Sequence, residues 1–135
     1  MKEKELHELR QYLASLKDVT LPSYAELPSI PLYMEQVVAY VNKTLEPLSM
    51  EDRQLLTSFM VNNYVKAKII AEPDKKKYNG NHLGYLLAIS SLKSVLSMSD
   101  IALLIGMDDD VSSDKSVLYK FFKNMTEDVY HDLGS

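Results

Sequence analysis

The segment 56–105 constrains the fold most, because two helical patterns flank a short lysine-rich turn there. Apolar residues recur at helical spacing over 58–69 and again over 82–96. The run Asp74-Lys75-Lys76-Lys77-Tyr78 lies between them, and the turn signals around it predict a tight hairpin within 72–79. We therefore expect a helix, a hairpin and a second helix in this order, with very little β-strand.

Capping residues and prolines set the boundaries of these two helices. Thr57 is expected to cap the helix at 58–69, and Pro73 to end it. Asn81 is expected to cap the helix at 82–96. In the first helix, the side chains expected to face inward are Met60, Val61, Tyr64 and Ala67.

Two further stretches have the Ser-x-x-acid pattern of a capping box. Ser49-Met50-Glu51-Asp52 predicts a short helix that reaches Leu56. Ser97-Met98-Ser99-Asp100 predicts a second short helix, with Gly106 as its stop.

The N-terminal part combines an amphipathic helix with an extended connector. The helix is predicted over 3–17, with one apolar stripe made by Leu6, Leu9, Leu13 and Leu16. The three prolines of 18–31 predict an extended connector. Pro31 suits the first turn of another helix, which Pro47 is expected to end.

The C-terminal part is predicted to be an acidic loop at 108–110 and a helix at about 113–132. The apolar stripe of this helix is formed by Val117, Phe121, Met125 and Val129. The chain thus divides into an N-terminal helix (1–20), a central domain (21–106) and a C-terminal part (107–135). This last part either packs on the domain or forms a dimer.

Composition excludes several classes of protein. With no cysteine, the chain forms no disulfide and no thiolate metal site. No apolar run approaches the roughly 18 residues that span a bilayer. The charged N-terminus lacks the apolar segment of a signal peptide, so we expect a cytoplasmic protein without a membrane partner.

Charge is segregated along the chain, although the net charge is only −4. Residues 57–93 contain six lysines and two acids, whereas 108–135 contain three lysines and seven acids. Local potential, not net charge, brings a protein to phosphates. A basic middle therefore favours a nucleic-acid partner, while a merely solvated lysine loop remains the alternative.

One polar face of the helix at 58–69 carries the candidate base contacts. Ser58, Asn62 and Lys66 share this face, with Asn63 beside it. An asparagine amide can pair with adenine N6 and N7 in the major groove. Candidate phosphate contacts are Lys66, Lys68, Lys75, Lys76 and Lys77.

Two tyrosines border these candidate contacts. Tyr78 joins the candidate DNA contacts, although packing of its ring to anchor the hairpin is the stronger interpretation. Tyr64 is expected in the core.

No pattern for catalysis or metal binding is present. His7, His82 and His131 have no metal-ligand spacing, so each is expected at the surface or in a cap. The acidic run lacks the Gly and Glu of a calcium loop. No Gly-rich phosphate loop or nucleophile–base pair appears. We expect a protein that is not an enzyme, with no cofactor and no small-molecule substrate.

The middle of the chain resembles the MerR-type winged helix-turn-helix. Asn62-Asn63-Tyr64 stands where that family usually has Arg-Tyr-Tyr, and Ile69-Ile70 matches its apolar pair. Lys76-Lys77-Tyr78 matches its Arg-x-Tyr wing, followed by a long helix and a short helix that opens with a serine. The resemblance implies an all-α winged helix-turn-helix-like fold with a short basic wing and flanking terminal helices.

Residues 21–105 more closely resemble an uncharacterised bacterial family, the domain of unknown function 1836. The resemblance covers the proline-flanked segment 27–37, the helical stretch 56–66 and Lys76-Lys77-Tyr78 followed by His82-Leu83. It implies a helical, winged helix-turn-helix-like protein of Firmicute-type bacteria, and it implies no activity.

These observations predict a small DNA-binding transcriptional regulator that binds double-stranded DNA as a homodimer. The helix at 3–17, the helix at 113–132, or both, would supply the dimer interface. The alternative is a protein-interaction module that keeps the fold without binding DNA.

Overall fold

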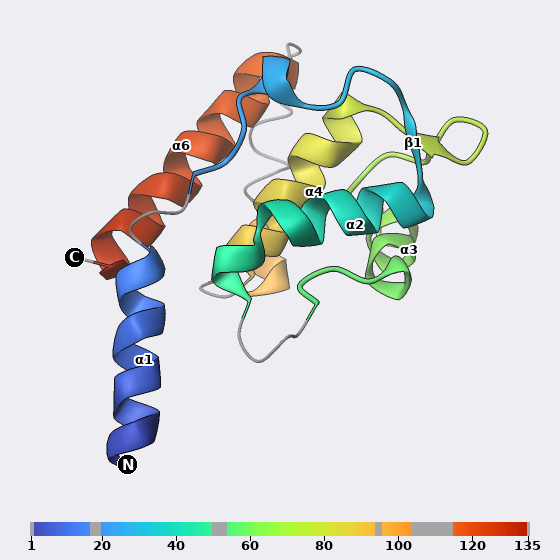
Figure 1. Cartoon of the computed structure of the whole chain (residues 1–135). Coiled ribbons are helices and arrows are strands. Elements are labelled where there is room, and N and C mark those ends of the chain that lie inside the picture. The colour runs from blue at the N-terminus through green and yellow to red at the C-terminus, as the bar shows by residue number, and fades with distance from the viewer. Residues whose placement is uncertain (1, 17–19, 50–53, 94–95, 104–114, 135) are drawn as a thin grey trace.

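Most of the chain is helical, and a very small antiparallel sheet joins two segments that lie far apart in sequence (Figure 1). The computed structural model describes residues 2–16, 20–49, 54–93, 96–103 and 115–134. The α-helices are α1 (Glu3–Leu16), α2 (Met34–Thr44), α3 (Ser58–Lys66), α4 (Gly80–Leu92) and α6 (Lys115–Gly134). The other elements are the 3-10 helices η1 (Tyr24–Glu26) and η2 (Glu46–Leu48), and the strands β1 (Leu32–Tyr33) and β2 (Lys77–Tyr78). Residues 98–103 are also helical.

Helix α4 forms the centre of the core. Every residue from His82 to Leu92 except Tyr85 is buried. A helix that is apolar on all sides needs neighbours on all sides. In this fold α4 packs against α2, α6 and β2 (Figure 1).

The second predicted helix begins later than expected. We expected Pro31 to stand in its first turn, but the next two residues form strand β1. Leu32 pairs with Tyr78, and Tyr33 pairs with Lys77. Because this pairing keeps the backbone extended, α2 starts only at Met34.

The segment after α2 also differs from the prediction. Helix α2 ends at Thr44, and Pro47 lies inside η2. Residues 54–56 are not helical. The side chain of Asn42 accepts a hydrogen bond from the Leu56 backbone N–H (2.9 Å) and donates one to its carbonyl (2.8 Å). Asn42 thereby holds Leu56 as a neighbouring strand would.

Helix α3 begins where the sequence predicts. The Oγ1 of Thr57 accepts a hydrogen bond from the backbone N–H of Met60 at 3.2 Å, which confirms the cap. Val61 and Tyr64 are buried and Met60 is half-buried. The prediction for Ala67 is wrong, because the helix has already ended there and the residue is exposed.

The end of α3 is a Schellman motif, not the stop at Pro73 that we expected. Lys68 is left-handed, with φ 61°. Its N–H donates to the carbonyl of Val65 at 3.0 Å, and the N–H of Ile69 donates to the carbonyl of Tyr64 at 3.0 Å. These bonds satisfy carbonyls at the end of the helix and turn the chain toward β2.

Helix α4 starts at Gly80, earlier than predicted, and Asn81 is not its cap. The cap is Asn79, whose Oδ1 accepts from the backbone N–H of His82 at 3.1 Å. Nδ1 of His82 accepts from the backbone N–H of Asn79 at 3.0 Å, which completes a capping box. The predicted cap at Ser97 is confirmed, since its Oγ accepts from the N–H of Asp100 at 3.1 Å.

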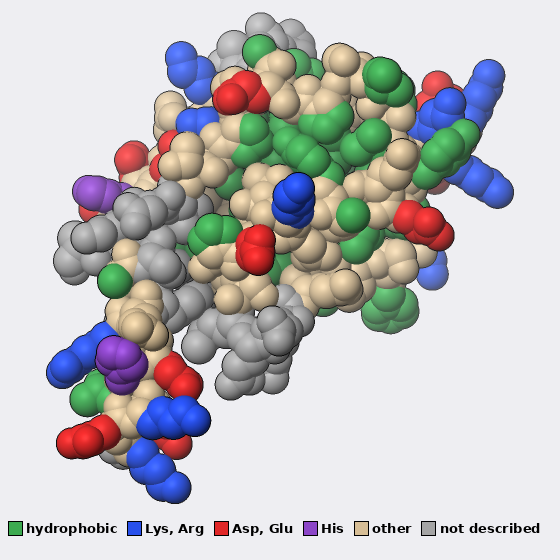
Figure 2. All heavy atoms as spheres, viewed as in Figure 1, with side chains coloured by type: hydrophobic (Ala, Val, Ile, Leu, Met, Phe, Trp, Pro, Cys, Tyr) green, Lys and Arg blue, Asp and Glu red, His purple; other side chains and the backbone are tan. Residues whose placement is uncertain are grey.

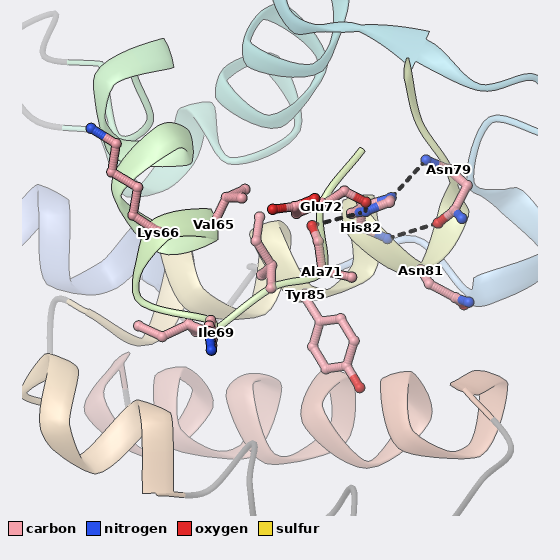
Figure 3. A pocket seen from close by; sticks show the side chains of 11 residues that line it. Val65, Lys66, Ile69, Ala71, Glu72, Asn79, Asn81, His82 and Tyr85 are labelled. Carbon is pink, nitrogen blue, oxygen red and sulfur yellow. Dashed lines mark hydrogen bonds between the residues drawn. The ribbon is translucent and has the colours of Figure 1, made fainter. Parts of the chain in front are cut away.

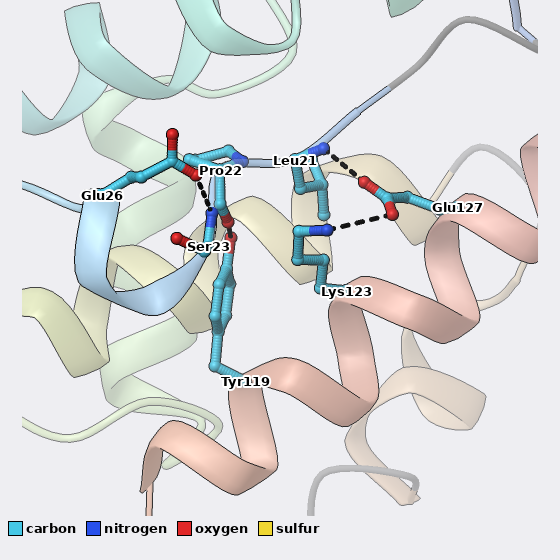
Figure 4. Close-up of polar contacts among 7 residues, drawn as sticks. All are labelled: Leu21, Pro22, Ser23, Glu26, Tyr119, Lys123 and Glu127. Atoms are coloured by element: carbon cyan, nitrogen blue, oxygen red, sulfur yellow. Dashed lines mark hydrogen bonds and ion pairs between the residues drawn. The ribbon is translucent and has the colours of Figure 1, made fainter.

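Helix α6 packs along α4 and fastens the connector that follows α1 (Figure 4). The hydroxyl of Tyr119 donates to the carbonyl of Pro22 at 2.7 Å. The backbone N–H of Leu21 donates to Glu127 at 2.7 Å, and Lys123 forms an ion pair with the same carboxylate at 3.1 Å. The connector is therefore held on the surface of α6.

Some predictions lie outside the described residues. These are positions 50–52 of the first capping pattern, the stop at Gly106 and the acidic loop at 108–110. The same holds for the side chains of Leu9, Leu13, Leu16, Val117, Phe121, Met125 and Val129.

Candidate functional site

The outer face of α3 carries the candidate base contacts. Ser58, Asn62, Asn63 and Lys66 are all exposed, as their spacing predicts. Phe59 also lies on this face and is 72 % exposed. Sequence reasoning missed it, although its position three residues before one asparagine and four before the next places it beside both.

The inner side of α3 is held by packing and by a partly buried lysine. Nζ of Lys93 donates to the carbonyl of Leu55 and lies 3.3 Å from the sulfur of Met60. Burial lowers the pKa of the Lys93 ammonium. Lys93 thus ties α4 to the segment that leads into α3.

The lysine-rich turn at 74–77 is a tight two-residue hairpin. Asp74 and Lys77 exchange backbone hydrogen bonds of 3.0 and 2.9 Å. Between them Lys75 and Lys76 have φ values of 51° and 67°. Two consecutive positive φ values define the type I′ turn, whose usual sequence is Asn-Gly or Asp-Gly. Both lysines are exposed.

The small sheet anchors this turn to the start of α2. Nζ of Lys77 lies 5.3 Å from the centre of the Tyr33 ring, within cation–π range. Figure 2 shows Lys and Arg side chains gathered over the turn, at the end of the molecule that α1 does not reach. Exposed acids Glu72 and Asp74 lie in the same segment as the three lysines.

The ring of Tyr78 lies in the core and is 3 % exposed. It packs edge-on against the ring of His82 at 5.3 Å between centroids. Burial raises the pKa of Tyr78. Its side chain anchors the turn, which was the stronger interpretation. Because the ring is buried, Tyr78 is not among the proposed DNA contacts. Tyr64 is also in the core.

His82 links α4 to the chain segment that leaves α3 (Figure 3). Its Nε2 lies 3.2 Å from the carbonyl oxygens of Ala71 and Glu72. Because carbonyls only accept and the Asn79 N–H only donates, this arrangement suits a neutral ring protonated at Nε2. The imidazole is buried and belongs to a cap, whereas His7 and His131 are exposed.

An open groove of about 670 Å³ lies between the C-terminal end of α3 and the start of α4 (Figure 3). Its apolar lining comes from Val65, Ile69, Ile70, Ala71 and Tyr85. Polar groups also line it, and they are Lys66, Lys68, Glu72, Asn79, Asn81 and His82. Sequence reasoning missed this groove, because it forms only when segments on both sides of the turn pack together.

Comparison with protein families identifies the chain. A family model described as a domain of unknown function (DUF1836) matches residues 22–132. The chain belongs to the DUF1836 family. Neither a curated protein nor a solved structure gives a significant match. The DUF1836 match covers α3, the lysine turn, the groove and nearly all of α6, and the MerR-type resemblance stays a prediction.

Among the residues that the structure describes in this DUF1836 protein, no three His, Asp or Glu side chains come together as a possible metal site. Within the same residues, no helix has the length and apolar character to cross a membrane. The exposed residues of α3 and the turn can form hydrogen bonds through their amides, bind anions through their lysines and make apolar contacts through Phe59.

Proposed function

We propose that this DUF1836 protein is a DNA-binding transcriptional regulator of the winged helix-turn-helix type, with no enzymatic activity. Helix α3 would enter the major groove, with Ser58, Asn62 and Asn63 at the base edges. The turn at 74–77 would act as the wing. Lys66, Lys68, Lys75, Lys76 and Lys77 would contact phosphates.

The conformation of the lysines is the observation that carries this proposal. Within the described part of the chain, the non-glycine residues with positive φ are Lys68, Lys75 and Lys76. A left-handed conformation costs a residue with a Cβ about 1–2 kcal/mol, and glycine avoids most of that cost. Backbone strain concentrates at functional sites. Lysine at three strained positions, one just after α3 and two in the turn, supports a role for positive charge at these places.

A homodimer is part of the proposal, because one helix in one half-site gives little affinity. Helix α1 projects away from the body of the molecule, and its described side chains are exposed (Figure 1). We assign the dimer interface to α1 on this ground. Helix α6 lies next to it, because α1 contacts α6 within the same chain.

The test is the salt dependence of binding to random-sequence duplex DNA, measured by fluorescence anisotropy. The variant has Lys75, Lys76 and Lys77 changed to Ala. The control has the exposed Lys43 and Lys120 changed to Ala, which removes two charges outside α1, α3 and the turn. We expect binding that weakens steeply with salt. The slope of the logarithm of the binding constant against the logarithm of salt concentration should become shallower by ~0.9 for each phosphate contact that the turn variant loses. It should change much less in the control.

The groove beside α3 favours a second function, a protein-interaction module. Its apolar lining would accept the side chains of a peptide. Folded protein that binds no duplex at low salt would refute the regulator and leave this alternative. Peptides selected from a random library on the wild type, and lost on a folded Ile69→Asp variant, would support it.

A further inference from the structure

Phe59 is unusual on α3 because it is a large apolar side chain in an otherwise polar, exposed face. It is 72 % exposed. Asn62 and Asn63 follow it by three and four residues, so all three side chains are neighbours on one side of the helix. Lys66, seven residues on, extends the same face.

The position contributes little to the fold. The apolar side of α3 is supplied by Val61 and Tyr64, which are buried, and by the half-buried Met60. An aromatic side chain kept in water leaves apolar area available for a partner.

We propose that Phe59 determines DNA specificity by packing on the C5-methyl group of a thymine. This inference rests on the proposed function, and it names the base that the α3 face selects. The thymine would lie in the base pair next to the one that Asn62 reads.

The chemistry of the major groove supports this pairing. Among the four bases, thymine alone presents a methyl group there, and phenylalanine is one of the side chains that contact it. Against cytosine or guanine, the ring would cover a polar group without replacing its hydrogen bond to water.

The geometry along the helix axis is also suitable. Phe59 and Asn62 are separated by three residues, or about 4.5 Å of helix rise. The rise between base pairs is about 3.4 Å. The two spacings differ by about 1 Å, so side chains three residues apart on α3 can reach adjacent base pairs, and an asparagine on adenine with Phe59 on thymine predicts consecutive A·T pairs.

The experiment removes only the methyl groups. A preferred duplex is first selected from a randomised pool with the wild-type protein. It is then made again with deoxyuridine in place of every thymine, which keeps base pairing and charge. Kd for both duplexes is measured by fluorescence anisotropy with wild type, Phe59→Ala and Ile30→Ala. Ile30 is the matched control, because it is 73 % exposed but lies outside α3.

Wild type and Ile30→Ala should bind the deoxyuridine duplex about three- to fivefold more weakly for each half-site, the effect of one buried methyl group, and so about nine- to twenty-five-fold for a dimer on two half-sites. Phe59→Ala should bind both duplexes equally and retain the wild-type circular dichroism. Equal binding of both duplexes by wild type would overturn the inference and leave the proposed function standing. So would an undiminished preference in Phe59→Ala. Failure of the wild type to select any duplex would overturn both.

Discussion

Lys75 and Lys76 form a turn whose backbone suits asparagine and glycine better than lysine. Both φ values are positive, and the two flanking residues close the turn with a pair of backbone hydrogen bonds. Substitutions at these two residues can therefore change the charge of the turn and its stability independently.

Replacing both residues at once, as Lys75→Asn with Lys76→Gly, should raise the free energy of unfolding by about 1–2 kcal/mol, because it relieves the left-handed strain. The same variant should bind duplex DNA more weakly. Urea unfolding and anisotropy measure the two effects. Lys75→Ala with Lys76→Ala removes the same charges without relieving the strain, so it should weaken binding with no gain in stability. Equal stability of the two variants would contradict the strain assigned to the turn.

The contact between α4 and α6 leaves no room for a larger residue at Gly84. A Cβ atom added at Gly84 of α4 would lie 2.6 Å from Cδ1 of the Tyr119 ring. That ring is buried and its hydroxyl is bonded to the connector, so it has little room to move. Gly84 thus sets the distance at which α6 packs on the central helix.

The variant Gly84→Ala should lower the free energy of unfolding by about 1–3 kcal/mol, as overpacking does in a well-packed core. This would reverse the usual advantage of alanine over glycine inside a helix. The control is Gly80→Ala, where the nearest heavy atom outside the surrounding backbone of α4, the Tyr24 hydroxyl, would be 3.9 Å from an added Cβ. Thermal and urea unfolding should show no comparable loss in the control. A Gly84→Ala protein as stable as wild type would refute the close packing of α6 on α4.

At the scale of the whole molecule, the stability of the fold depends on pH through tyrosines that are buried or partly buried. Burial raises the pKa of Tyr40, Tyr64, Tyr78 and Tyr119, which lie on α2, α3, β2 and α6. Tyr119 is shifted furthest, mainly by desolvation. Because the folded state holds these protons more tightly than the unfolded state, they contribute stability below pH 10 that is lost as the pH rises further.

Stability should therefore fall as the pH rises above about 10, where the tyrosines of the unfolded chain begin to lose their protons. The variant Tyr119→Phe should be about 1 kcal/mol less stable near neutral pH, since the carbonyl of Pro22 loses its donor. Its loss of stability with alkali should nevertheless be smaller than in wild type. Urea unfolding at a series of pH values measures both effects. Tyr33→Phe, at a half-exposed ring, controls for the loss of one tyrosine. If the free energy of unfolding fell equally with pH in wild type and Tyr119→Phe, the contribution of the buried Tyr119 proton to stability would be refuted.

Local signals in the sequence were enough to predict the mainly helical character, the caps at Thr57 and Ser97, the tight turn and the exposed polar side of α3. Each depends on residues a few positions apart, through side-chain to backbone bonds or helical spacing. Phe59 was within reach of the same spacing argument, which places it beside Asn62 and Asn63.

Contacts between distant residues decided the remaining features. Pairing of Leu32 with Tyr78 replaced a helical turn by strand β1, and the side chain of Asn42 kept Leu56 extended. The bonds of His82 to the chain after α3 closed one side of the groove. The sequence by itself determined the helices and their faces, because these follow from local spacing. Only the tertiary structure decided where α2 begins and that Leu56 stays extended, because those hydrogen bonds form only once the core brings both partners together.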